Sequence, residues 1–169
     1  NSLWQQITGS AIAGPRRGQQ LRSMPMSLTT WAQWRDVHPG TKLLSEQTGF
    51  ERDYSNKSPY GDYDHSDRLL FPVSGAAGLR LHPKTVVYRT LIEERSVAIS
   101  ERALLAEARV QMEFDGGALT WTRLADGSVR ARFDGKPVEA VHRVFWFAWI
   151  SFHPGTILYD PAGAPGRPD

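Results

Sequence analysis

Three runs of alternating apolar and polar residues, each followed by a glycine-containing turn or loop, constrain the fold of this chain most strongly. The runs span residues 109–114, 118–124 and 129–133, and they are separated by Asp115-Gly116-Gly117 and Asp126-Gly127. Alternation with a period of two is typical of half-buried strands. An Asp-Gly pair between two such runs is a strong hairpin signal. This part of the sequence therefore predicts an antiparallel meander.

The remaining periodic segments predict one more hairpin and only short helices. Residues 85–92 and 95–99 are apolar, β-branched runs that turn at Glu93-Glu94. Ser100 stands where it can cap a short helix that ends near Ala108. We therefore expect a mainly β (β-rich α+β) fold, with an antiparallel twisted sheet or a partly closed barrel and two or three short helices.

A thirteen-residue pattern, W-x-x-W-x-x-x-H-P-G-T-x-L, occurs twice, from Trp31 to Leu43 and from Trp146 to Leu158. The first copy begins with a capping box between Thr30 and Gln33. The helix should end at the histidine, because a residue before proline is disfavoured in the helical region, and a strand should follow. Two indoles one helical turn apart form a wide apolar anchor. The repeat predicts a pseudo-duplicated fold with both helices on the same sheet system. Its structural residues are Trp31, Trp34, His38, Trp146, Trp149 and His153.

The two copies differ in polarity. Arg35-Asp36 in the first copy correspond to Ile150-Ser151 in the second. We therefore expect the second helix to be buried on more of its circumference and the first to contact water. Trp4 and Trp121 should also be largely buried.

Composition excludes several classes of protein. With 169 residues, of which 40% are hydrophobic and 22% charged, the chain suits one folded domain. We expect this domain over residues 1–160 and a flexible Pro/Gly-rich tail over 161–169. Twenty basic against 18 acidic residues leave too little positive charge for a nucleic-acid binder, and no apolar run is long enough for a transmembrane segment. The absence of cysteine excludes thiolate metal sites, disulfides and a cysteine nucleophile.

A stretch from Gly49 to Arg68 lacks helical or strand periodicity and is rich in tyrosine and aspartate. A loop of this length is uncommon in a compact domain and is often functional. Its carboxylates, with the amide of Asn56, are oxygen ligands of the kind that Ca²⁺ prefers. The alternative is a structural loop whose aspartates cap turns or pair with Arg52 and Arg68. The candidate ligand-binding residues are Arg52, Asp53, Tyr54, Tyr60, Asp62, Tyr63 and Asp64, and the candidate metal ligands are Asp62, Asp64 and Asp67.

Other chemistry has weaker support in the sequence. The five histidines show no metal-binding spacing, so they could hold Zn²⁺ or Cu²⁺ only if folding brings a pair together. Met24-Pro25-Met26 has the spacing of a copper(I) site, although methionine is also a common core residue. A G-x-S-x-G elbow and a glycine-rich phosphate loop are both missing. The sequence therefore requires no cofactor and predicts no catalytic residue, and a hydrolase that uses loop carboxylates is a third class.

Four blocks of the sequence stand out together: SLWQQITGSAIAGP, TTWAQWRDVHPGTKLLS, TGFERDYSNKSPYGDYDHSDRLLFPV and FWFAWISFHPGTILY. They resemble the DUF3179 family, a bacterial domain of unknown function. The resemblance runs through most of residues 3–159 and is weak between Leu91 and Val138. It transfers no catalytic residue.

The resemblance implies a bacterial protein that is periplasmic or extracellular. It also implies an upstream half with a Cys-Pro-x-Cys motif, so we expect this chain to be the C-terminal portion of the family domain. Its partner would then be its own N-terminal half or a partner chain. The function we expect is a non-enzymatic structural or ligand-binding module. The alternative is a metal- or redox-linked protein whose active centre is completed by the cysteine-containing half.

Overall fold

The computed structural model describes residues 1–24, 26–54, 60–70, 73 and 80–160. Its strands form one two-stranded and two four-stranded sheets, and three short α-helices accompany them. The described part of the chain contains no closed barrel, so the mainly β fold is confirmed in its open-sheet form. The predicted tail over 161–169 and Asn56 lie outside the described residues.

The three predicted strands of the meander form, and a short fourth strand extends them. β5 (Arg109–Phe114), β6 (Gly117–Arg123), β7 (Val129–Phe133) and β8 (Lys136–Pro137) pair in sequence order, and every neighbouring pair is antiparallel. Asp115 and Gly116 both have a positive φ, of 51° and 78°, at the turn between β5 and β6. Two successive positive φ values are the geometry of a type I′ turn, whose twist matches that of the flanking strands.

The second four-stranded sheet has the order β10-β4-β3-β9. β3 (Val86–Ile92) and β4 (Arg95–Ser100) form the predicted hairpin, β9 (His142–Phe145) is antiparallel to β3, and β10 (Ile157–Tyr159) is parallel to β4. The parallel pair departs from the antiparallel sheet that we expected. It arises because α3 (Trp146–Ile150) connects β9 to the opposite edge of the sheet, so that β9 and β10 run in the same direction.

Each face of this second sheet carries its own core. On one face Val97 and Ile99 pack with α2 (Glu101–Ala106) and with Trp121 of the meander. Ser100 caps α2 as predicted, by accepting a hydrogen bond from the backbone N–H of Ala103. On the other face, Val87 and Ala98 pack against α3 through Trp146 and Trp149.

The N-terminal hairpin forms a separate small sheet of β1 (Leu3–Gln5) and β2 (Ser10–Ala13). Ala11 is buried within it, whereas Trp4 is partly buried and is less completely covered than Trp121, which is 0% exposed. A strand of three residues in a two-stranded sheet offers too little surface to cover an indole on all sides.

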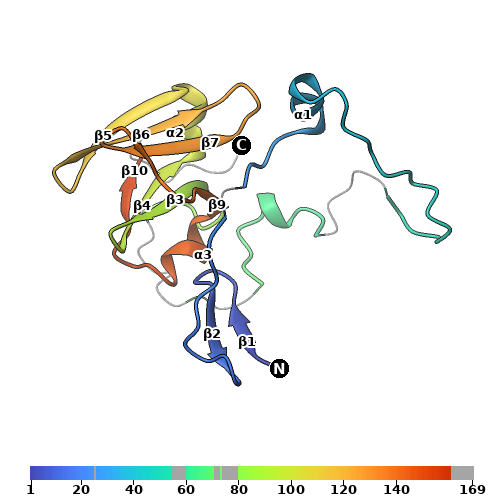
Figure 1. Ribbon diagram of the computed structural model, residues 1–169, viewed down its shortest axis with the longest axis horizontal. Coiled ribbons are helices and arrows are strands. Elements are labelled where there is room, and N and C mark those ends of the chain that lie inside the picture. The colour runs from blue at the N-terminus through green and yellow to red at the C-terminus, as the bar shows by residue number, and fades with distance from the viewer. Residues whose placement is uncertain (25, 55–59, 71–72, 74–79, 161–169) are drawn as a thin grey trace.

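The first tryptophan helix, α1 (Trp31–Val37), forms but does not pack on a sheet. Its capping box between Thr30 and Gln33 is complete, and it ends at His38 as predicted. None of its residues is buried, and the prediction that both tryptophan helices pack on one sheet system is therefore wrong. Its N-terminal end is held where Thr29 Oγ1 donates to the carbonyl oxygen of Asp126, in the turn after β6. Figure 1 shows the rest of α1 lying away from the two four-stranded sheets.

Four short segments that the sequence predicts as strands form none among the described residues. Residues 41–44 and the described residues of 21–26 and 69–73 have no strand pairing, and residues 138–141 connect β8 to β9 instead of extending the meander. A strand forms only where a neighbour accepts its backbone hydrogen bonds. The segment over 41–44 has the sequence of a strand but lacks such a neighbour among the described residues.

Candidate functional site

Most of the described residues of the predicted loop lie on the surface, and the C-terminal end of the loop is held by residues next to the sheet core. Arg52, Asp53 and Tyr54 are exposed, and so are Tyr60, Asp62 and Asp64, whereas Tyr63 begins the 3₁₀ helix η1 (Tyr63–His65) and is half-buried. No group of three His, Cys, Asp or Glu side chains among the described residues could hold a metal ion. The ligand-binding and metal-binding roles of the loop stay predictions.

A buried lysine, which the sequence analysis did not single out, holds the end of this loop. Lys84 Nζ donates to the carbonyl oxygens of Tyr63 and Ser66 and lies 3.6 Å from the centroid of the Tyr63 ring. Asp67, a candidate metal ligand, instead accepts a hydrogen bond of 2.9 Å from His82 Nε2. Asp67 and Tyr63 therefore have structural partners, and these partners are not the arginines that the structural alternative named.

The two copies of the repeat have the same internal geometry. We call residues 31–43 the first Trp–His unit and residues 146–158 the second Trp–His unit. The ring centroids of Trp34 and His38 are 4.0 Å apart in the first unit, and those of Trp149 and His153 are 3.7 Å apart in the second. In each unit the backbone N–H of the histidine donates to the backbone carbonyl oxygen of the tryptophan four residues before it, at 2.8 Å in the first unit and 3.1 Å in the second. The threonine N–H then donates to the histidine carbonyl oxygen, at 3.1 Å in both units.

The two units differ in the group that accepts the hydrogen bond of the indole N–H. In the first unit, Trp34 Nε1 donates directly to Thr41 Oγ1 of the same unit at 2.9 Å. In the second unit, a residue of β4 stands between the two groups: Trp149 Nε1 donates to Ser96 Oγ at 2.9 Å, and Ser96 Oγ lies 2.7 Å from Thr156 Oγ1.

The hydroxyls of the second unit form a directed chain. Thr156 Oγ1 donates to the carbonyl oxygen of His153 at 2.6 Å, so its hydrogen is already used. The Ser96 hydroxyl must then donate to Thr156 and accept from Trp149. Every polar group in this buried chain therefore has a partner, and the residues that follow Thr156 continue as β10 beside β4.

The two units also differ in how far their tryptophan side chains are buried. Trp149 is 0% exposed and Trp146 is 1% exposed, whereas Trp31 is 41% exposed. The expectation that the second helix is the more buried one is confirmed. Leu43 and Leu44, which correspond to residues of β10, are 72% and 93% exposed. The first Trp–His unit thus has the local structure of a docked element without the sheet on which the second unit docks.

A buried cation lies beside the second unit. The Arg89 guanidinium carbon lies 4.0 Å from the centroid of the Trp149 ring, and Arg89 Nη2 donates to His142 Nδ1 at 3.0 Å. Burial lowers the pKa of Arg89 to about 10. Burial, and then the charge of Arg89, lowers the pKa of His142 and of His153 below the usual value of 6.5.

The lowered pKa values of His142 and His153 predict that the protein is less stable in mild acid than at neutral pH. Because their pKa values are lowered in the folded state, the unfolded chain takes up protons first as the pH drops below 6.5. The free energy of unfolding is therefore unaffected by the titration of these histidines above pH 6.5. It falls as the pH drops from 6.5 to their pKa values in the folded state. We expect the urea midpoint to be lower at pH 5.5 than at pH 7.5. The double variant His142→Gln, His153→Gln should reduce this difference, and an unchanged difference in the variant would contradict the assignment.

The fold and these units define a mainly β domain with one docked and one undocked copy of a helix-and-turn element. The chain belongs to the family described as Protein of unknown function (DUF3179), which it matches over residues 1–141. This confirms the family resemblance seen in the sequence, but the matched range includes residues 91–138, where the resemblance is weak, and ends before the fourth block at residues 145–159. A search of curated proteins and a search of solved structures gave no match. Among the described residues, every helix is too short or too polar to cross a membrane.

Proposed function

We propose that this chain is a non-enzymatic interaction domain whose first Trp–His unit binds the exposed edge of a β-sheet in a partner protein. The proposal depends on one observation: the two units share their internal hydrogen bonds and ring stacking, but within the part of the chain that the structure describes only the second lies against a sheet edge. A bound copy and an unbound copy of one element in the same chain give a template for how the unbound copy would bind.

The template specifies the partner's edge strand. β4 offers Ser96 to the indole and threonine of the second unit, and its edge accepts residues 157–159 as a parallel strand. The matching partner strand would carry a serine or threonine that inserts between Trp34 and Thr41. Its unpaired edge would receive residues 42–44, which now lack strand pairing.

The polar residues of the first unit restrict the partner further. Where the second unit places Ile150 and Ser151, the first has Arg35 and Asp36, and both are exposed. A partner surface that covers α1 should therefore be polar at this point, with an acidic group opposite Arg35.

The exposed apolar side chains of the unit provide the driving force. Trp31, Val37 and Leu43 of the unit are exposed, and so is Leu44, which follows the unit directly. Tryptophan is among the residues that most often dominate binding energy at interfaces. Addition of a strand to a free sheet edge supplies main-chain hydrogen bonds, and side-chain pockets supply specificity.

Photo-cross-linking in cells tests the proposal. A photoreactive amino acid replaces Leu44 in one sample and Leu105 in the control, since Leu105 is 62% exposed and lies on α2, far from the unit in the sequence. We expect position 44 to cross-link to a partner peptide that forms an edge strand with a nearby serine or threonine. Trp34→Ala should abolish this product, because it removes the indole that would hold the partner hydroxyl.

Two outcomes would contradict the proposal. The first is a product from position 44 no stronger than that from position 105. The second is a product that survives Trp34→Ala or maps to a helix or loop of the captured protein. Capture alone is not sufficient, because any exposed leucine can trap a neighbour.

A further inference from the structure

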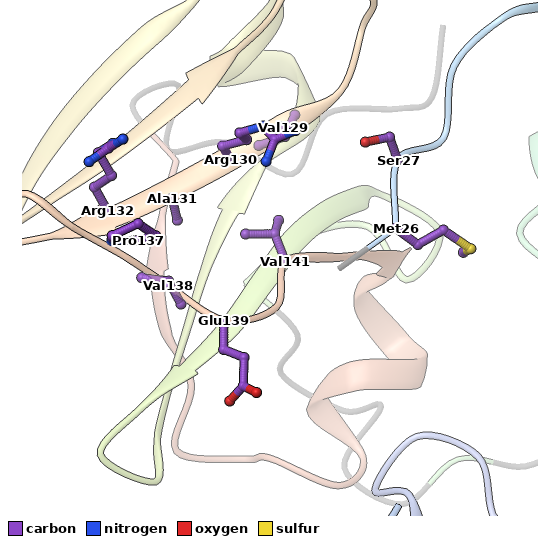
Figure 2. Close-up of a pocket in the computed structure, with 10 residues that line it drawn as sticks. All are labelled: Met26, Ser27, Val129, Arg130, Ala131, Arg132, Pro137, Val138, Glu139 and Val141. Atoms are coloured by element: carbon purple, nitrogen blue, oxygen red, sulfur yellow. The ribbon is translucent and has the colours of Figure 1, made fainter. Parts of the chain in front are cut away.

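A cavity of about 650 Å³ lies between β9, residues 24 and 26–28, and the turn after β1. Its volume falls within the range of roughly 300–1,000 Å³ that is typical of small-molecule sites. Most of its wall is apolar, with side chains from Ile7, Leu28, Val141 and Val144. A smaller cavity of about 260 Å³ shares Val129 and Val141 with it. Figure 2 shows Val141 of this smaller cavity standing between β7 and the segment that carries Met26 and Ser27.

The charges on the wall of the larger cavity have one sign. Arg89, His142 and Arg143 line it, and none of the described residues that line it is acidic. Arg143 is already neutralised, because its Nε and Nη2 bind the two oxygens of Glu101 at 2.9 Å and 3.2 Å. Arg89 is 7% exposed and makes no ion pair with a carboxylate among the described residues. The cavity therefore has one buried positive charge that is not balanced by the residues around it.

Two hydrogen-bond donors at this charge are unused. Arginine can only donate, so His142 Nδ1 must accept from Arg89 and the imidazole hydrogen must be on Nε2. His142 Nε2 and Arg89 Nε are both buried and have no acceptor within the described structure. A buried donor without an acceptor costs roughly 1–3 kcal/mol. A ligand that supplies acceptors would remove this cost.

We infer that this cavity binds a small amphiphilic carboxylate, whose oxygens accept from Arg89 and His142 and whose short aliphatic tail lies along the apolar wall. A carboxylate supplies the negative charge and the acceptors together, and bonds to a charged donor are stronger than neutral ones. The valine, isoleucine and leucine side chains then bury the tail. The site is independent of the first Trp–His unit, since no residue of that unit lines the cavity.

Calorimetric titration of the purified chain with octanoate and with 1-octanol tests the inference. The two probes have tails of the same length and differ in the head group. We expect octanoate to bind saturably with a dissociation constant in the millimolar range or below, and octanol to bind about tenfold more weakly or worse. Absence of saturable octanoate binding, or equal affinity for both probes, would overturn the inference.

Variants test which residues hold the ligand. Arg89→Met should weaken octanoate binding about tenfold or more and should leave octanol binding nearly unchanged. Arg109→Met is the matched control, because Arg109 is an exposed arginine of β5 outside the cavity. Octanoate binding that persists in Arg89→Met would overturn the assignment.

A second variant avoids any effect of Arg89 on folding, since Arg89 also stacks on Trp149. Leu28→Asp places a negative charge on the cavity wall and should repel octanoate. Leu28 is 61% exposed, so the fold should tolerate the change. Leu105→Asp, at a residue that is 62% exposed and outside the cavity, is its control. Equal octanoate affinity in these two aspartate variants would contradict the location of the site.

Discussion

Trp149→Ala is expected to lower the free energy of unfolding by about 3–5 kcal/mol, which is the cost typical of removing a large aromatic side chain from a core. Trp149 is 0% exposed, and its ring stacks on His153. The Arg89 guanidinium lies over the same ring, and the indole N–H donates to Ser96. Removal of Trp149 would leave a cavity under α3 and would break the hydroxyl chain that joins β4 to Thr156. Urea unfolding followed by far-UV circular dichroism measures the loss.

The equivalent substitution in the first unit is the matched control. Trp34 has the same histidine stack and a threonine partner, but no sheet of the described residues covers it. Trp34→Ala should therefore cost less than about 1 kcal/mol, as is usual for surface positions with local contacts only. A loss of stability as large as that of Trp149→Ala would mean that α1 is held by the rest of the chain, and it would contradict the proposed role of the first unit.

The elements that the sequence predicted well are those whose partners are close in the chain. The β3–β4 hairpin and the three-strand meander each depend on a turn of two or three residues and on alternation within the flanking runs. The capping box at Thr30 is also local, since it needs only Gln33. Such features are decided by neighbouring residues, and a pattern in the sequence is enough to predict them.

The misplaced elements depend on partners that are far away in the chain. Residues 41–44 and β10 have similar sequences, yet of the two only β10 is a strand. The chain leaves α3 next to the free edge of β4, and β10 pairs with that edge. The same motif thus gives two different structures in two environments. The sequence indicates this difference in docking only through polarity: the first copy has Arg35-Asp36 where the second has Ile150-Ser151.

The candidate site shows the same limit. Arg89 meets His142 because β3 and β9 pair in the register that places them opposite each other. No local spacing connects these two residues, and His142 drew attention only as one of five histidines. The acidic loop, by contrast, was conspicuous through its composition, but composition alone could not show that Lys84 and His82 hold its end.

Trp121→Ala should have an effect similar in size to Trp149→Ala, about 3–5 kcal/mol, but in the other core. Trp121 lies at the centre of β6, opposite Val110 and Ala131, and is 0% exposed. It packs in the core that joins the meander to α2 and to the second sheet. Loss of its ring would separate these layers, and the urea midpoint should fall accordingly.

The phenylalanine variants distinguish packing from hydrogen bonding. Trp121 Nε1 is buried without an acceptor within the described structure, so Trp121→Phe loses ring volume but no hydrogen bond. Trp149→Phe loses a comparable volume together with the bond to Ser96, and it leaves the serine oxygen without its donor. We therefore expect Trp149→Phe to be the more destabilising of the two, by about 1–3 kcal/mol. Equal losses would mean that the indole–Ser96 bond adds little to docking, and the template on which the partner's serine or threonine was assigned would then lose its basis.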